Sequence, residues 1–195
     1  MRRSALIVID VLNEFFERPP LSERREAVAR NINQLVRLFR EHHHPIIWVR
    51  QEFRPDLSDA FLDMRKTGVR VTIEGTEGAR ILGELDQRPA DTVIVKRRYS
   101  AFFDTPLDDI LRAARPDVLV IGGVNTHACV RTTVIDAYQR DYEVVVASDC
   151  TTSYDDAHHE VTRRYLDGRI ASFLSNPEIH ALIAEEATND AAGAS

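Results

Sequence analysis

The chain has 195 residues, of which 44% are hydrophobic and 29% charged, a composition typical of one soluble domain with a substantial core. Its formal net charge of -6 argues against a surface that binds nucleic acid or anionic membranes, because such a surface needs clustered basic residues. The apolar run that opens the chain stops at Asp10, too early for a signal peptide or a membrane span, so we expect a cytoplasmic protein.

Short β-branched runs predict six strands along the chain. Most of these runs are apolar without alternation, as expected for parallel strands that are covered by helices on both faces. The predicted strands are Ala5–Ile9, Pro45–Val49, Thr92–Val95, Val118–Ile121, Val144–Ala147 and Arg169–Ser172.

Longer amphipathic runs between the strands predict helices. Ser22 is expected to cap a helix that reaches His42, and Pro106 is expected to occupy the first position of another. Two further helices are predicted over about residues 128–140 and 155–166. This alternation predicts a single-domain, doubly wound α/β fold, with a mainly parallel six-stranded sheet and helices on both faces.

Two segments depart from the alternation. Residues 51–88 form a long polar stretch with four glycines, which is typical of surface loops around a functional site. The alanine-rich residues 187–195 are expected to form a disordered tail, so the domain itself is predicted to span residues 1–186.

Three residues with reactive side chains follow predicted strands. Asp10 ends the first strand, Lys96 ends the third, and the fourth leads through Gly122-Gly123 to Cys129. Ligands of open α/β sheets bind beyond the carboxyl ends of the strands, so these side chains form a candidate nucleophilic set. Taken singly, each also has a structural explanation: an aspartate that caps a turn, a solvated lysine beside two arginines, and a small packing cysteine.

A cysteine reacts as its thiolate, so its ordinary pKa of about 8.5 must be lowered or its proton removed. We expect the helix start near Cys129 and the charge of Lys96 to favour the thiolate, and Asp10 to take the proton. Backbone amides before Cys129 are expected to stabilise an oxyanion, at about 2.7–4 kcal/mol for each donor. The second cysteine, Cys150, is expected to be inert packing in a reducing compartment.

Three segments resemble the isochorismatase-like cysteine hydrolase superfamily, which includes nicotinamidases, N-carbamoylsarcosine amidohydrolases and isochorismatases proper. In the family's order and spacing, they are ALIVIDVLNEFF, VKRRYSAFFDTPLDDILR and VLVIGGVNTHACVRTTVIDAYQRDYEVVVASDCTTS. The resemblance implies a Rossmann-like sheet and a catalytic triad of Asp10, Lys96 and Cys129. It also implies a cis peptide bond between Val124 and Asn125.

The reaction implied by the resemblance is attack by Cys129 on the carbonyl of a small amide or ureide, loss of ammonia or an amine, and hydrolysis of the thioester. The backbone amides of Asn125 and Cys129 would form the oxyanion hole. Two other functions stay open: vinyl-ether hydrolysis of the isochorismatase type, which would use Asp10, and a non-catalytic binding role. Isochorismatases proper generally lack the cysteine, which disfavours the first, and the complete triad disfavours the second.

The same resemblance bears on metals and cofactors. Nicotinamidases carry an Asp-x-His metal motif after the second strand, where this sequence has Glu52 and Arg54. No histidine occurs between His44 and His127, so that loop has no histidine to offer a metal. We therefore expect no metal and no cofactor, and we disfavour a nicotinamidase.

Several residues near the predicted site are candidate substrate contacts. Arg50, Arg54 and Arg131 would suit a carboxylate, although a surface ion pair explains each of them equally well. His127 is expected either to act at the site or to stabilise its own loop. The family resemblance implies a homodimer or a homotetramer. The candidate substrate-binding residues are Asn13, Phe16, Gln51, Tyr99, Phe102, His127 and Arg131.

Overall fold

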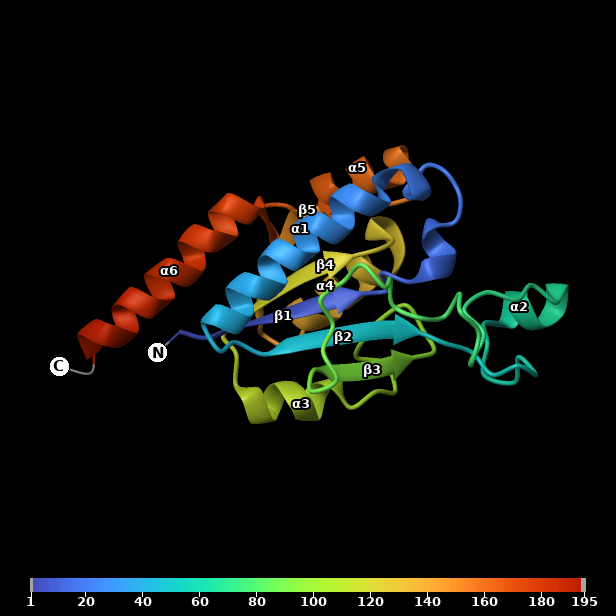
Figure 1. Ribbon diagram of the computed structural model, residues 1–195, viewed down its shortest axis with the longest axis horizontal. Coiled ribbons are helices and arrows are strands. Elements are labelled where there is room, and N and C mark those ends of the chain that lie inside the picture. The colour runs from blue at the N-terminus through green and yellow to red at the C-terminus, as the bar shows by residue number, and fades with distance from the viewer. Residues whose placement is uncertain (1, 194–195) are drawn as a thin grey trace.

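The computed structural model of the chain describes residues 2–193. Its centre is a six-stranded, all-parallel sheet in the order β3-β2-β1-β4-β5-β6 (Figure 1). The predicted doubly wound α/β fold is therefore confirmed. The strand order reverses between β1 and β4, and sheets of this kind bind ligands at the carboxyl edge of such a point. The strands are β1 (Ser4–Ile9), β2 (Ile46–Gln51), β3 (Thr92–Lys96), β4 (Val118–Gly123), β5 (Glu143–Thr151) and β6 (Ser172–Leu174).

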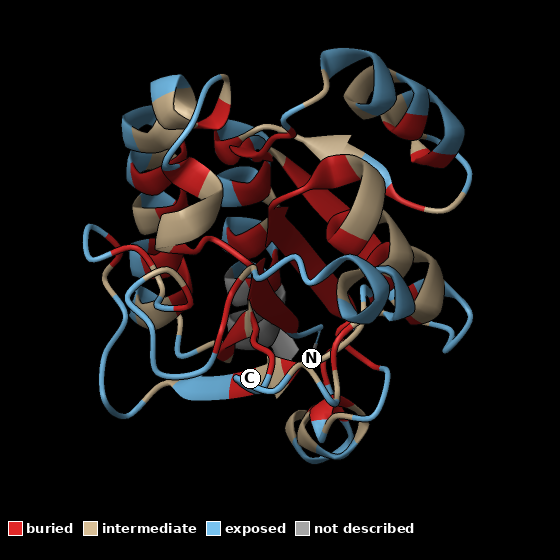
Figure 2. Ribbon diagram, turned by 90° about the vertical axis from the view of Figure 1, so that its right-hand side faces the viewer, coloured by how far each residue is buried: buried red, intermediate tan, exposed pale blue. Residues whose placement is uncertain are grey.

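Helices cover both faces of this sheet. One face packs against α1 and α6, and the other packs against α3, α4 and the end of α5. Figure 2 shows the result: the central strands are buried, and most exposed residues lie on the outer sides of the helices and in the loops. The five helices are α1 (Leu21–Glu41), α3 (Leu107–Ala114), α4 (Arg131–Tyr138), α5 (Asp156–Leu166) and α6 (Asn176–Gly193).

Two helices begin differently from the prediction, and proline is the reason in both. α1 starts at Leu21, directly after Pro20, so Ser22 lies inside the helix and does not cap it. α3 starts at Leu107, which places Pro106 in the capping position and not in the first turn. The proline ring fixes φ near the helical value, so the chain is already turned into the helix at each of these residues.

Two other elements are shifted or divided. The helix predicted over residues 128–140 consists of a short π-helix, η2 (Thr126–Val130), followed by α4. The last strand covers Ser172–Leu174 and not residues 169–172. The reason is the turn that ends α5, in which Gly168 has a φ of 72° and the amide of Ala171 donates to the carbonyl of Leu166.

The backbone of α6 continues to Gly193, so it is helical where the sequence analysis expected a disordered tail. Alanine has the highest helix propensity of the common residues, so an alanine-rich segment readily extends a helix that packing has started. Residues 194–195 lie outside the described residues. The domain boundary at residue 186 remains a prediction.

The connection between β2 and β3, residues 52–91, contains the long polar stretch noted in the sequence and is called the excursion below. It contains one short helix, α2 (Leu62–Thr67), and a small hydrophobic cluster centred on Phe53, Ala60 and Ile73. Figure 1 shows α2 standing away from the sheet on the side of the carboxyl ends of β2 and β3. Arg97 anchors the excursion to the end of β3, because its Nε lies 2.6 Å from Asp59 Oδ2.

We predict that Gly123→Ala destabilises the fold by more than about 3 kcal/mol. Gly123 has a φ of 128°, and a Cβ atom there would lie 2.0 Å from the carbonyl oxygen of Ile9, which is backbone of the neighbouring strand and cannot move aside. Gly83→Ala is the matched control, because its Cβ would meet nothing within 4 Å. Urea unfolding measures both. Equal midpoints for the two variants would contradict this account.

Candidate active site

Asp10, Lys96 and Cys129 meet in one buried cluster at the carboxyl edge of the sheet. Lys96 is its centre: the Nζ atom lies 2.7 Å from Asp10 Oδ2 and 3.2 Å from Cys129 Sγ. The same ammonium donates to the carbonyl oxygen of Arg98 at 3.0 Å. Asp10 and Lys96 are fully buried and Cys129 is almost so. The structure therefore brings together the three residues that the sequence analysis placed at neighbouring strand ends.

Strand alternation and register place these side chains on one face. Ile94 of β3 packs in the cluster beneath α3 and α4, and Lys96, two residues later, points to the same face. β2 pairs with β3 so that Gln51 lies opposite Lys96. Asp10 leaves β1 with a φ of 54°, a left-handed conformation that aspartate tolerates better than most residues.

The surroundings of Cys129 favour its neutral thiol, although Lys96 by itself favours the thiolate, as the sequence analysis expected. Burial raises the pKa of the thiol, the charge of Asp10 raises it further, and Lys96 offsets only part of this. Burial lowers the pKa of Lys96, but the interactions with Asp10 and Cys129 together outweigh burial and raise the pKa above its ordinary value. A carboxylate, an ammonium and a neutral thiol sum to zero charge, the favoured state of a buried group of ions.

This electrostatic balance leaves one route to a thiolate. The carboxylate of Asp10 pairs with Lys96 through Oδ2 at 2.7 Å and also interacts with the thiol of Cys129. A proton that passes from Cys129 to Asp10 leaves the total charge of the cluster at zero. The thiolate would then lie beside the ammonium of Lys96, so proton transfer within the cluster costs less than loss of the proton to solvent.

The turn before Cys129 has the backbone form implied by the resemblance. The Val124–Asn125 peptide bond is cis, and Cys129 lies within η2, where the amide of Val130 donates to the carbonyl of Asn125 at 3.3 Å. The loop between β5 and α5 supports this turn from one side. The amide of Tyr154 donates to Asn125 Oδ1 at 3.2 Å.

His127 is held by side chains of that same loop. Its Nδ1 lies 2.7 Å from Ser153 Oγ, and its Nε2 lies 3.3 Å from the hydroxyl of Tyr154. Burial lowers the pKa of His127, and the neighbouring His158 lowers it further. Through these two contacts, His127 stabilises the loop between β5 and α5.

Gln51 is the predicted substrate contact that lies beside the cluster. Its side chain is buried and follows Val49 on the face that carries Lys96. The Nε2 atom is buried and has no hydrogen-bond partner among the described residues. A buried amide donor without a partner costs about 1–3 kcal/mol, so this atom is suited to an incoming acceptor.

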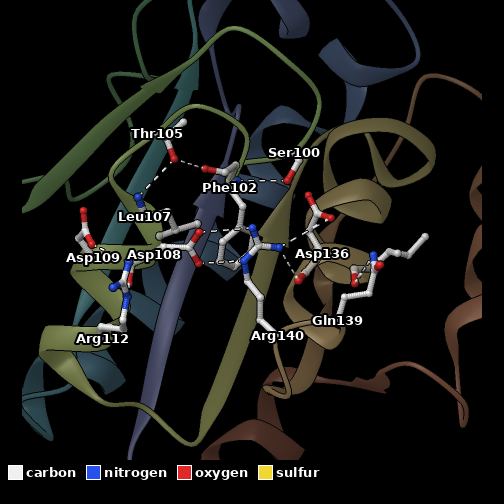
Figure 3. A network of polar contacts seen from close by, with 12 residues as sticks. Ser100, Phe102, Thr105, Leu107, Asp108, Asp109, Arg112, Asp136, Gln139 and Arg140 are labelled. Atoms are coloured by element: carbon white, nitrogen blue, oxygen red, sulfur yellow. Dashed lines mark hydrogen bonds and ion pairs between the residues drawn. The ribbon is translucent and has the colours of Figure 1, made fainter.

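Each of the other predicted contacts has a partner within the protein, and their contact with a substrate remains a prediction. Figure 3 shows the ring of Phe102 beneath Arg140, whose guanidinium carbon lies 4.4 Å from the ring centre. Phe16 is part of the hydrophobic core, Asn13 donates to the carbonyl of Glu77, Tyr99 contacts Phe61 with the two rings tilted, and Arg131 lies over Tyr165. Of the arginines considered for a carboxylate, Arg50 pairs with Glu52 at 3.1 Å and Arg54 lies 3.9 Å from Asp59.

A cavity of about 490 Å³ adjoins the turn, with Asn125 in its wall. Two aromatic residues that the sequence analysis did not single out line it, Phe15 and Tyr154. Phe15 precedes the buried Phe16 in the short 3-10 helix η1 (Asn13–Phe16), and only the fold decides which of the two faces the cavity. No pattern in the sequence marked Tyr154, which lies 29 residues after Asn125 in the chain.

The described residues also bear on metals and membranes. Within residues 2–193, no group of three or more His, Cys, Asp or Glu side chains is arranged to hold a metal ion. Glu52, at the position of the nicotinamidase aspartate, is buried and pairs with Arg50. In the same part of the chain, no helix is long and apolar enough to cross a membrane.

An all-parallel sheet that holds a carboxylate, an ammonium and a thiol at its switch point is the architecture of isochorismatase-like cysteine hydrolases. The chain belongs to the isochorismatase family: the sequence model of the Isochorismatase domain matches residues 4–177.

Individual relatives agree with this assignment. The chain is 36% identical over 160 residues to an Arabidopsis thaliana protein named "Probable inactive nicotinamidase", covering 78% of this chain and 82% of the relative. An isochorismatase family protein from Desulfovibrio vulgaris superposes with a TM-score of 0.85 at 28% identity, covering 94% of this chain and all of that one. N-carbamoylsarcosine amidase from Thermoplasma acidophilum superposes with a TM-score of 0.75 at 27% identity, covering 89% and 96% of the two chains.

The charge balance of the cluster predicts how Cys129 responds to alkylation, measured with iodoacetamide in a Cys150→Ala background. The raised pKa predicts slow labelling at pH 7 and a rate that still rises above pH 9. Asp10→Asn removes a negative charge beside the thiol, so it should lower the pKa and speed labelling at pH 7, about tenfold for each unit of pKa. Lys96→Met should slow labelling. Slower labelling of the Asp10→Asn variant would contradict the charge balance.

Proposed function

We propose that this protein is a cysteine-dependent amidohydrolase that cleaves the C–N bond of a small carboxamide or of a carbamoyl or ureido compound. The observation that carries the proposal is the position of Lys96, whose ammonium contacts both Asp10 and Cys129. This contact supplies a nucleophile, a proton acceptor, and a fixed positive charge beside both. The similarity to an N-carbamoylsarcosine amidase supports the same reaction class.

In the proposed reaction, Asp10 takes the thiol proton of Cys129 as the sulfur attacks the carbonyl carbon. The carbonyl oxygen becomes an oxyanion, which the backbone amides of Asn125 and Cys129 stabilise. Asp10 then gives its proton to the departing nitrogen, and ammonia or an amine leaves. A water molecule, deprotonated by Asp10, attacks the thioester and releases the acid, and the proton held by Asp10 returns to Cys129.

Gln51 has a proposed role in placing the substrate. Its buried Nε2 lacks a partner in the described structure, and a substrate oxygen beside Lys96 would supply one. Binding would then remove the cost of an unsatisfied buried donor. None of these steps needs a metal or a cofactor.

Vinyl-ether hydrolysis remains the alternative within the family, and it would use Asp10 as an acid without the thiol. The contact between Lys96 and Cys129 Sγ disfavours this alternative, since vinyl-ether hydrolysis does not use the thiol and needs no positive charge beside the sulfur. A cytoplasmic location and a homodimeric or homotetrameric assembly remain predictions.

We expect Cys129→Ala to lower kcat/KM by about a thousandfold or more on any amide that the protein hydrolyses, because the nucleophile is lost. Ammonia release from N-carbamoylsarcosine, biuret, ureidoacrylate, maleamate and simple carboxamides, with and without EDTA, measures the effect. Cys150→Ala is the control, since its Sγ contacts Asn176 and lies outside the cluster. Full activity of the Cys129→Ala variant would refute the proposal, and so would loss of wild-type activity in EDTA.

A further inference from the structure

The cavity beside Asn125 takes its apolar lining residues from three separate segments. Phe15 and Leu21 come from the connection between β1 and α1, Val71 from the excursion, and Tyr154 from the loop between β5 and α5. A volume of about 490 Å³ falls within the range of small-molecule sites. This volume is much larger than a urea-sized substrate would fill.

The charged residues around this cavity cancel one another. Two acids, Glu14 and Glu17, and two guanidinium groups, Arg18 and Arg70, line it, so their formal charges sum to zero. Glu14 Oε2 accepts a hydrogen bond from the amide of Thr72 at 2.6 Å and is thereby held at the wall. The cavity therefore offers no net attraction for a carboxylate.

Tyr154 is exposed and yet fixed in place. The residue is 57% exposed, so its ring is accessible to a ligand. The hydroxyl lies 3.3 Å from His127 Nε2, and the two rings meet edge to face with centroids 4.9 Å apart. The backbone amide is bonded to Asn125, so the ring has a defined position relative to the turn.

We propose that this cavity binds the acyl group of the substrate and that Tyr154 is a specificity-determining residue, which favours amides with a bulky, uncharged, apolar acyl group. This inference rests on the proposed amidohydrolase function, since it takes Asn125 as the point where the scissile carbonyl binds. The acyl group extends from that carbonyl into the cavity and packs on the face of Tyr154. Because the charges that line the cavity sum to zero, a carboxylate on the acyl group is not expected to increase the affinity of an amide.

Binding to the inactive Cys129→Ala variant tests the subsite without turnover. Ligand-observed NMR titrations compare cyclohexanecarboxamide with acetamide, and crotonamide with fumaramate, its carboxylated counterpart. Tyr154→Ala should weaken the bulky amide relative to acetamide by about three- to tenfold, the range for one aromatic contact. Tyr154→Phe should recover most of that loss. Tyr165→Ala is the control, since Tyr165 is an exposed tyrosine of α5 that contacts Arg131 and does not line the cavity.

Equal weakening of both amides by Tyr154→Ala would overturn the subsite, and so would tighter binding of fumaramate than of crotonamide. Failure of the bulky amide to bind would do the same. Failure of the amidohydrolase proposal looks different, because the bulky amide would still bind in a Tyr154-dependent manner while wild-type protein released no ammonia from it.

A second inference concerns Arg24 of α1, whose guanidinium clamps the loop between β5 and α5. Its Nη1 donates to Thr152 Oγ1 and to the carbonyl of Ser153, both at 3.0 Å, and its Nη2 donates to Asp156 Oδ2 at 2.9 Å. That loop in turn holds the turn before Cys129. The amide of Thr126 donates to the carbonyl of Thr152 at 3.0 Å.

We infer that Arg24 is a positioning residue, which fixes the turn through the loop and so keeps the amides of Asn125 and Cys129 aimed at one point. Arg24 touches none of the reacting groups. Its effect on the reaction therefore depends on the geometry of the proposed oxyanion hole, whose contribution is made in the transition state.

Arg25 provides a matched control. It is the neighbouring residue, its side chain is 32% exposed against 33% for Arg24, and it makes a similar two-pronged contact with Glu84 away from the turn. Arg24→Ala should lower kcat about tenfold or more with KM within about twofold, and Arg25→Ala should leave both unchanged. Arg24→Lys should restore part of kcat, because lysine keeps the charge but not the fork.

Hydrogen exchange of the peptide covering residues 123–130 provides a readout that needs no substrate. Arg24→Ala should speed exchange in this peptide, while Arg25→Ala should not. Equal changes in the two variants, in exchange or in kcat, would overturn the inference. Altered exchange without any amide turnover would retain Arg24 as the clamp and reject the proposed function.

Discussion

The buried ammonium of Lys96 is the constraint on which the candidate site depends. An ammonium without water must have an anionic partner, and losing the partner of a buried ion pair typically costs about 3–5 kcal/mol. Asp10 supplies that partner at 2.7 Å from the end of another strand. The sheet must therefore keep its register, because a slip of one residue would turn Lys96 to the opposite face.

The same pair determines how the thiol behaves. Lys96 favours a thiolate, but Asp10 and burial oppose it more strongly, so Cys129 rests as a neutral thiol. The proton has a nearby acceptor in Asp10, whose side chain interacts with the thiol. A neutral thiol reacts slowly with electrophiles from solvent. In the proposed reaction, the proton moves to Asp10 only when a substrate carbonyl is bound next to the sulfur. This differs from activation by a helix dipole, in which the thiolate exists before any substrate arrives.

Around the cluster, two tasks remain: the support of the turn before Cys129 and the proposed recognition of the substrate. The loop between β5 and α5 does both: its backbone holds the turn at Asn125, and its Tyr154 faces the cavity. Arg24 ties this loop to α1, on the opposite face of the sheet from Lys96. The excursion between β2 and β3 and the connection after β1 supply the remaining walls, so the cavity is formed where three connections meet above a rigid sheet.

The sequence by itself indicated the parallel sheet and placed Asp10, Lys96 and Cys129 after its strands, because strands and the polar residues that follow them are local patterns of a few residues. It did not give the last strand, whose start is set by the turn after α5. With the family resemblance it also determined the cis peptide bond at Val124–Asn125. Only the tertiary structure decided that Phe15 and not Phe16 faces the cavity, and that Arg24 reaches a loop 128 residues away in the chain. The physical reason is that a side chain in an irregular turn is aimed by contacts with distant segments, which no local periodicity encodes.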